Sequence, residues 1–121
     1  MTDPPVSQPV GPYTPIVRAG DWLVCSGQLG LHDGRLVEGG VAEQVAQAVR
    51  NIDGLLASQG SRLGDVVKTT VFLADIGDYP AMNDAYITAF GQHRPARSAF
   101  AVAALPLGAA VEIEAWAYRG T

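Results

Sequence analysis

Arg97 is the first side chain in this sequence whose neighbours suggest chemistry. It lies in an alanine-rich stretch, and strand alternation places Ala99, Ala101 and Ala103 on the same face. These small side chains leave open space in front of the guanidinium. A guanidinium is a planar fork of donors that can hold a carboxylate through two parallel hydrogen bonds. Arg97 is therefore a candidate for binding a small carboxylate.

The last predicted strand carries two carboxylates on one face. Alternation places Glu112 and Glu114 beside Trp116 and Tyr118, and it places only small or aliphatic residues on the other face. Carboxylates next to large aromatics indicate a covered face, with a solvated edge strand as the alternative. An ion pair between Arg97 and one of these glutamates is the structural alternative to a ligand site.

Whether Arg97 and Glu112 meet depends on how their strands pair. If segments 96–104 and 111–119 form a simple hairpin, Arg97 lies opposite residues near Ala117 and about 17 Å from Glu112. The two side chains then do not meet within one chain. A site that uses both would have to form across a subunit boundary.

Other reactive residue types form no recognisable site. His32 and His93 are too isolated to indicate a metal centre, and the single cysteine, Cys25, lies in an apolar stretch and is expected in the core. Ser26 belongs to no nucleophile elbow. Gly39 and Gly40 precede a predicted helix, but they match neither a Walker nor a dinucleotide pattern. We expect no metal.

Length and composition predict one compact domain over residues 1–121 and limit its partners. Apolar residues make up 48% of the chain and charged residues 17%, enough to bury a core and a subunit interface. The net charge of −4 and scattered basic residues argue against nucleic acid. The lone cysteine and the lack of a long apolar run lead us to expect a cytoplasmic protein that does not enter membranes.

The predicted elements must position these candidates. Five prolines in the first fifteen residues predict an extended, partly irregular arm, most clearly over residues 1–10. Apolar spacing and turn signals at Gly20-Asp21 and Asp33-Gly34 define the rest. The predicted order is strands at 16–18 and 22–26, a helix over 42–60, a strand at 65–75, a helix capped by Asp78 with Met82, Tyr86 and Phe90 on one side, and strands at 96–104 and 111–119. This order predicts an α+β fold with both helices on one face of the sheet and a subunit partner on the other.

Five separated segments resemble one known family. They are Gly11-Pro12-Tyr13, Cys25-Ser26-Gly27-Gln28, Val67-Lys68-Thr69-Thr70-Val71-Phe72, Pro95-Ala96-Arg97-Ser98 and Val111-Glu112-Ile113-Glu114-Ala115. Their order and intervals are similar to those of the RidA family, also called YjgF. The resemblance runs from about Gly11 to the C-terminus, and the arginine signature near the end is its most distinctive part.

The resemblance implies a chorismate-mutase-like fold, a homotrimer with three clefts between subunits, and no cofactor. Relatives in the deaminase branch hydrolyse 2-imino acids and their enamine tautomers to 2-keto acids and ammonia. Arg97 matches the arginine that holds the substrate carboxylate, and Glu112 matches the glutamate that positions the attacking water. Four further residues match the substrate-binding cleft: Tyr13, Ser26, Gly27 and Asn83.

One position departs from the family pattern. Ala99 stands where the deaminase branch commonly has a cysteine, which the family uses largely through its backbone near the substrate nitrogen. The substrate therefore stays open, with 2-iminobutanoate and 2-iminopropanoate as examples and a specialised deaminase of aminomuconate type as a variant. The alternatives are a non-catalytic trimer that binds a small carboxylate for regulation, and an endoribonuclease or translation inhibitor. The acidic composition argues against the last.

Overall fold

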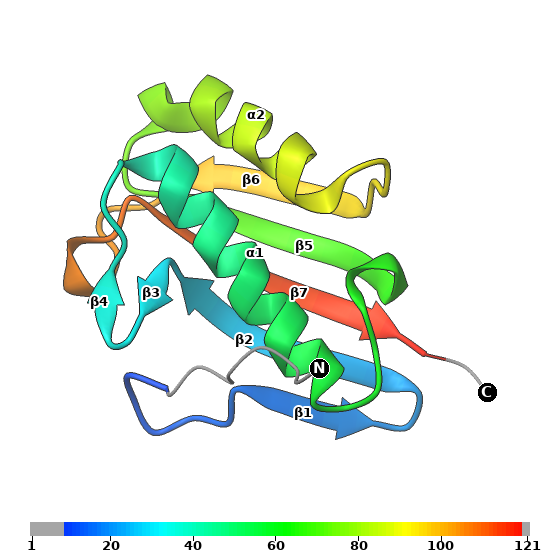
Figure 1. Ribbon diagram of the computed structural model, residues 1–121. Helices are drawn as coiled ribbons and strands as arrows, with labels where there is room; N and C mark the ends of the chain where they lie inside the picture. Colours follow the sequence, from blue (N-terminus) through cyan, green and yellow to red (C-terminus); the bar gives the residue numbers. More distant parts are fainter. Residues whose placement is uncertain (1–8, 120–121) are drawn as a thin grey trace.

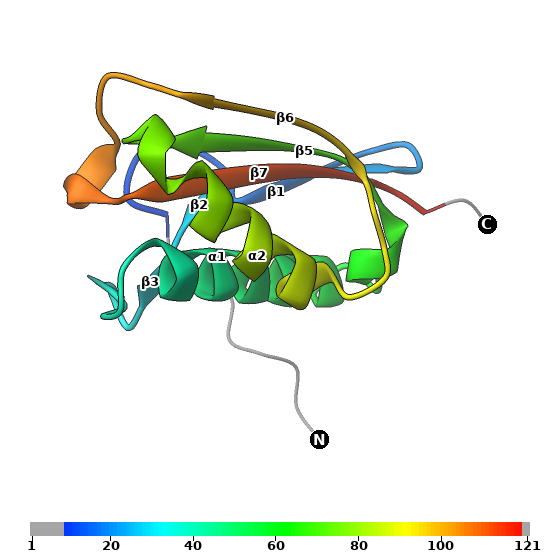
Figure 2. The same cartoon turned by 90° about the horizontal axis from the view of Figure 1, so that it is seen from above.

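The computed structural model describes residues 9–119 and contains a five-stranded sheet with both α-helices on one face (Figures 1 and 2). The main strands are β1 (Ile16–Ala19), β2 (Trp22–Leu29), β5 (Val66–Leu73), β6 (Ala96–Ala101) and β7 (Val111–Tyr118), and the helices are α1 (Val41–Ala57) and α2 (Tyr79–Phe90). A small hairpin joins β3 (Leu31–His32) to β4 (Arg35–Leu36), and short 3-10 helices cover Leu63–Asp65, Ile76–Asp78 and Pro106–Gly108. The predicted α+β architecture is confirmed.

Helix α1 forms where the apolar stripe predicted it. Six of its apolar residues are at most 2% exposed: Val45, Ala48, Val49, Ile52, Leu55 and Leu56. This stripe packs on β2 and β7 and, at its side, on α2. The chain then turns at Gly60, which has a φ of +73° that side chains with a Cβ rarely adopt. The predicted helix over 42–60 is confirmed, although its regular part ends at Ala57.

The strand order is β1-β2-β7-β5-β6, so β6 and β7 do not pair. The predicted hairpin of segments 96–104 and 111–119 is wrong. Helix α2 is the crossover that returns the chain parallel to β5, which places β6 at the sheet edge. Strand β7 instead runs antiparallel between β2 and β5. Its small, fully buried Ala115 and Ala117 fit this central position under α1.

The two faces of β7 differ as the alternation predicted. Val111, Ile113, Ala115 and Ala117 face the helices and are 0% exposed. Glu112, Glu114, Trp116 and Tyr118 lie on the opposite face, which neither helix covers (Figure 2). Because β7 has a strand on each side, the alternative of a solvated edge strand is wrong.

Large aromatics gather on the uncovered face. The ring of Trp22 packs edge-on against Trp116 and Tyr118, with centroids 6.1 and 5.1 Å away. Phe72 and Phe100 form a second edge-on pair at 5.4 Å. Four of these five rings are between 37% and 46% exposed in the single chain: Trp22, Phe100, Trp116 and Tyr118. Such a face is typical of a surface that a partner covers.

The start of α2 differs from the prediction, because Asp78 precedes the helix but its side chain makes no capping hydrogen bond. Asp75 instead caps the short 3-10 helix Ile76–Asp78, where its side chain accepts from the Gly77 amide at 2.8 Å. The proline-rich arm lies partly outside the described residues, which begin at Pro9, and the chain from Pro9 to Pro15 forms neither helix nor strand. None of the helices in the described part of the chain is long and apolar enough to cross a membrane.

Candidate functional site

Arg97 lies on the helix-covered face of the edge strand β6. Its partner in β5 is Thr69, whose side chain is fully buried beneath α2. The guanidinium therefore reaches α2, where Nη2 donates to the Tyr79 hydroxyl at 2.9 Å and to Asn83 Oδ1 at 2.7 Å. Among the described residues, the acceptor of its Nη1 is the Met82 sulfur alone, at 3.8 Å. All three partners are neutral.

Two tyrosine rings also hold the guanidinium. The Arg97 Cζ atom lies 4.9 Å from the centroid of the Tyr86 ring and 5.5 Å from that of Tyr79. Tyr86 is fixed in turn by a 2.6 Å hydrogen bond between its hydroxyl and Thr69 Oγ1. Cation–π contacts stabilise a guanidinium without neutralising its charge. Arg97 is thus oriented by groups that leave its positive charge available.

No carboxylate within residues 9–119 comes to ion-pair distance of Arg97. The predicted structural alternative, an ion pair with Glu112 or Glu114, is therefore wrong within one chain. The physical reason is the sheet itself, because Arg97 faces the helices while both glutamates face the uncovered side. Ala99 follows Arg97 on the same face and packs against the core.

Glu112 lies directly over Gly27. A Cβ built on Gly27 would come within 2.6 Å of Glu112 Oε2 and 2.9 Å of its Cδ. Only glycine therefore leaves room for the carboxylate here. Gly27 lies where the β2–β7 register shifts between Cys25 and Gln28. Glycine is common at such irregularities and where another group approaches the backbone closely.

Ser26 ties the N-terminal arm to this region. Its hydroxyl donates to the Thr14 carbonyl at 2.6 Å, and its amide donates to the Pro15 carbonyl at 2.8 Å. Tyr13, 41% exposed, comes from the same arm and lines a small recess together with Gly27. The arm thus places Tyr13 and Ser26 beside Gly27, the residue over which Glu112 lies.

The carboxyl of Glu112 is more basic than an ordinary glutamate. Burial raises its pKa because it disfavours the charged form, and the nearby charge of Glu114 raises the pKa further. A carboxylate whose pKa is raised is a stronger base than an ordinary glutamate when it is ionised. This property suits a residue that orients and deprotonates a water.

Cys25 has the opposite character from a reactive group. It is 1% exposed, and burial raises the pKa of its thiol to about 12. The thiol is therefore protonated at neutral pH and inert, which confirms Cys25 as a small core residue. Among the described residues, no three histidine, cysteine or acidic side chains lie close enough together to hold a metal ion.

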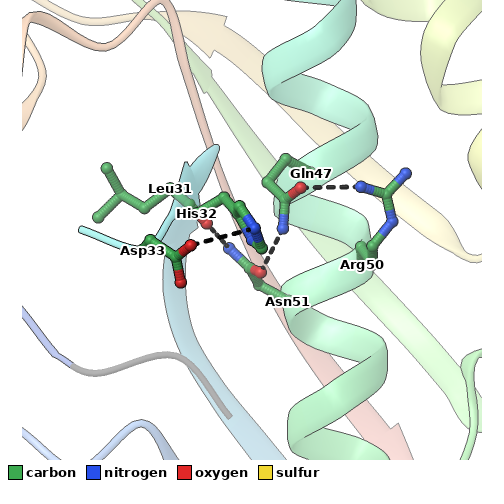
Figure 3. A network of polar contacts seen from close by, with 6 residues as sticks. All are labelled: Leu31, His32, Asp33, Gln47, Arg50 and Asn51. Atoms are coloured by element: carbon green, nitrogen blue, oxygen red, sulfur yellow. Dashed lines mark hydrogen bonds and ion pairs between the residues drawn. The ribbon is translucent and has the colours of Figure 1, made fainter. Parts of the chain in front are cut away.

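Sequence reasoning missed a ladder of buried amides on α1. Asn51, 7% exposed, donates to the Leu31 carbonyl at 3.0 Å and accepts from Gln47 at 2.9 Å (Figure 3). Its side chain also donates to the Leu29 carbonyl at 3.1 Å. Gln44 Oε1 accepts from the Ala110 amide at 2.9 Å. The signal was the helical spacing of the three amides, at 44, 47 and 51, beside the apolar stripe.

This ladder supports the position of Glu112. Leu29 pairs with Glu112 across β2 and β7, and Ala110 lies just before β7 begins. Helix α1 therefore holds both strand ends beside the carboxylate through buried side-chain hydrogen bonds, whose loss would leave carbonyls unsatisfied.

The predicted site residues fall into two groups. We call Asn83, Arg97 and Ala99 the arginine half-site. The glutamate half-site consists of Tyr13, Ser26, Gly27 and Glu112. Strand β5 separates them: Arg97 aligns with Thr69 and Glu112 with Phe72, three residues further along and on the other face. With about 3.3 Å per residue and about 4.8 Å between strands, a single chain cannot bring the two half-sites together.

Comparison with known proteins agrees with the fold. The family profile described as Endoribonuclease L-PSP matches residues 4–119. The 2-iminobutanoate/2-iminopropanoate deaminase of Mus musculus is 46% identical over 113 residues, covering 92% of this chain and 84% of that protein.

Two solved structures are similar over nearly the whole chain. RidA from the Antarctic bacterium Psychrobacter sp. PAMC 21119 is 37% identical with a TM-score of 0.89, covering 93% of both chains. E. coli TdcF with bound serine is 32% identical with a TM-score of 0.89, covering 95% of this chain and 94% of that one. The chain belongs to the RidA family, also called YjgF, whose profile carries the name Endoribonuclease L-PSP.

Proposed function

We propose that this protein is a hydrolytic deaminase of reactive 2-imino acids and enamines, such as 2-iminobutanoate and 2-iminopropanoate. The products are 2-keto acids and ammonia. Arg97 binds the substrate carboxylate and Glu112 positions the attacking water. The relatives named 2-iminobutanoate/2-iminopropanoate deaminase support this assignment, being 45% to 48% identical over most of the chain.

The observation that carries the proposal is the environment of Arg97. A half-buried guanidinium is normally neutralised by a carboxylate, because its charge is costly to desolvate. Arg97 has only neutral partners in the described part of the chain, and they come from an amide, a hydroxyl and a thioether. A small anionic ligand supplies the missing negative charge. Serine, bound in the E. coli relative, is one small molecule with a carboxylate.

The reaction needs little beyond positioning. Water adds to C2 of the protonated imine, and Glu112 takes a proton from that water as the new C–O bond forms. Glu112 then returns this proton to the amino group of the carbinolamine, so that the C–N bond breaks with loss of ammonia. The hydroxyl proton passes to water as the C2 carbonyl forms. Arg97 fixes the carboxylate so that C2 faces the water, which contributes through orientation. Ala99 contributes its backbone near the substrate nitrogen, and Asn83 lines the carboxylate end.

The complete site requires more than one chain. We infer a homotrimer in which the arginine half-site of one subunit faces the glutamate half-site of the next, giving three clefts between subunits. The large aromatics on the uncovered face of the sheet support an assembly, because they are 37% to 46% exposed in the single chain. We place the protein in the cytoplasm, where the buried, unpaired Cys25 needs no oxidising environment.

The test is keto-acid release from an imine made in the same vessel. A threonine dehydratase supplies 2-iminobutanoate, and semicarbazide competes for it. Wild-type protein should accelerate keto-acid formation. Arg97→Ala should lose at least about 100-fold of this acceleration, because it removes two charge-assisted hydrogen bonds. Arg18→Ala is the matched control, since Arg18 is exposed and its side chain donates to the backbone carbonyl of Gln59. Equal acceleration by wild type and Arg97→Ala would refute the proposal.

A second function uses the same cleft without turnover. The neutral surroundings of Arg97 equally favour tight binding of a 2-keto acid by a regulatory trimer. Calorimetry separates the two: tight keto-acid binding by a wild-type protein that does not accelerate imine hydrolysis supports regulation.

The name of the family profile raises ribonuclease activity as a further alternative. The net charge of this protein, −4, argues against ribonuclease activity, because phosphate backbones are held by clustered lysines and arginines. RNA cleavage that persists at wild-type level in purified Arg97→Ala protein would place any such activity outside the cleft.

A further inference from the structure

The hydrogen bonds of Arg97 point to a second carboxylate-binding residue. We propose that the Tyr79 hydroxyl binds the substrate carboxylate together with Arg97, donating its proton to a carboxylate oxygen. This inference rests on the proposed function and extends it by one residue that neither the family resemblance nor the sequence pattern indicated.

The donors of the Arg97 guanidinium limit how a carboxylate can bind to it. A carboxylate can bind Arg97 through two parallel hydrogen bonds along either of two edges, Nε with Nη2 or Nη1 with Nη2. Both edges use Nη2. That nitrogen already donates to the Tyr79 hydroxyl at 2.9 Å and to Asn83 Oδ1 at 2.7 Å. A carboxylate that binds along either edge therefore replaces one of these two neutral acceptors.

Tyr79 is the partner that can give up its hydrogen bond from Nη2 and still contact the bound carboxylate. A phenolic hydroxyl both accepts and donates, and its hydrogen rotates about the C–O bond. The Tyr79 proton has no acceptor among residues 9–119, so it is available to a carboxylate oxygen that arrives beside Nη2. A hydrogen bond from a hydroxyl to a carboxylate oxygen is short, and it is stronger than a hydrogen bond between neutral groups. Asn83 presents its oxygen, which cannot donate.

The other nearby hydroxyl does not compete for this role. Tyr86 also stacks on Arg97, but its hydroxyl is bonded to Thr69 Oγ1 at 2.6 Å inside the core. The two tyrosines therefore divide the work. Tyr86 supports the guanidinium from a buried position. Tyr79 is half-buried, and its hydroxyl lies beside Nη2 of the guanidinium.

The position of Tyr79 is set by the start of α2. It is the first residue of the helix, Pro80 follows it, and the preceding turn is held by the hydrogen bond from the Gly77 amide to Asp75. Proline in the first turn fixes the backbone in the helical conformation. The hydroxyl is thus held on a rigid element, as a binding group must be.

The experiment compares Tyr79→Phe with wild type in binding and in turnover. Calorimetry with 2-oxobutanoate and 2-oxopropanoate should show a Kd about tenfold higher for Tyr79→Phe with both acids, because both share the carboxylate. In the dehydratase assay KM should rise about tenfold while kcat stays within about twofold. Thr88→Val is the matched control, since it also removes one hydroxyl from α2, at an exposed position where that hydroxyl donates to the Asp84 carbonyl at 3.2 Å.

The outcomes separate this inference from the proposed function. A Kd within twofold of wild type, or a loss confined to the longer keto acid, would overturn the role of Tyr79 even if Arg97→Ala abolishes turnover. A tenfold loss of keto-acid binding in Tyr79→Phe, found together with a wild-type protein that hydrolyses no imine, would support the role of Tyr79 and refute the deaminase. Circular dichroism of Tyr79→Phe that matches wild type confirms that the loss does not come from unfolding.

Discussion

The two half-sites lie on opposite faces of the sheet and hold charges of opposite sign in different ways. At the arginine half-site a cation is held by neutral groups and aromatic rings under α2, with no carboxylate at ion-pair distance in the described chain. At the glutamate half-site the Glu112 carboxylate lies on the Gly27 backbone, and burial and the charge of Glu114 raise the pKa of Glu112. Within residues 9–119, each half-site leaves its charge without an oppositely charged partner. The comparison teaches that the chain carries complementary charges that its own topology keeps apart.

Mixed assemblies give the largest expected effect. Arg97→Ala and Glu112→Ala, each inactive alone, are co-expressed with different tags and purified for trimers that contain both. If each cleft takes Arg97 from one subunit and Glu112 from the next, either mixed composition has one intact cleft in three, so activity should return to about one third of wild type. If both residues came from one subunit, the mixed trimers would stay inactive.

Gly27→Ala should separate activity from stability at the glutamate half-site. The added Cβ would meet the far end of the Glu112 side chain at 2.6 Å, and that end can rotate away. The fold should survive, while displacement of the carboxylate should lower kcat/KM about 100-fold. Gly64→Ala is the control, because its added Cβ would have its nearest neighbour at 3.7 Å. Loss of stability with kcat/KM retained would contradict this role of Gly27.

Glu114→Gln should give the smallest effect, a shift in pH dependence. Glu114 is the second cause of the raised Glu112 pKa, after burial. Glu112 must be ionised to accept a proton from water, so the acid limb of kcat/KM should move to lower pH when Glu114 loses its charge. Glu38→Gln, at an exposed position, should leave the profile unchanged. A shift to higher pH would contradict the assignment.

The same pKa shift has a stability consequence with a definite sign. A raised pKa means that folded Glu112 holds its proton more tightly than the unfolded chain does. Stability therefore falls as pH rises from the ordinary glutamate pKa through the raised one. Glu112→Gln should remove this part of the pH dependence, as thermal unfolding at several pH values would record.

The sequence was most informative where local pattern decides structure. The apolar stripe of α1, the alternation of β7 and the burial of Met82, Tyr86 and Phe90 on α2 all follow from side-chain spacing and are confirmed. Arg97 and Glu112 were identified from sequence as candidates, and their family motifs implied their roles. Those roles stay predictions that the experiments above test.

The sequence pattern did not predict which strands pair across the sheet. The chain joins β6 to β7 through one short loop, which suggests a hairpin, yet β7 inserts between β2 and β5. Strand segments of similar composition do not encode which neighbours they take, because pairing depends on crossover handedness and on packing under both helices. The partners of Arg97 were equally hidden, since Tyr79 and Asn83 reach it only because α2 folds back over β6.

The sequence by itself thus determined the α+β class, the main helix and strand segments, and which side chains are candidates to bind a carboxylate and activate water. These follow from local spacing and side-chain chemistry. Only the tertiary structure decided that Arg97 and Glu112 face opposite sides of the sheet, that Gly27 makes room for the Glu112 carboxylate, and that Tyr79 stands beside the guanidinium. Strand order sets the face and neighbours of every side chain, and it is fixed by packing across the whole chain.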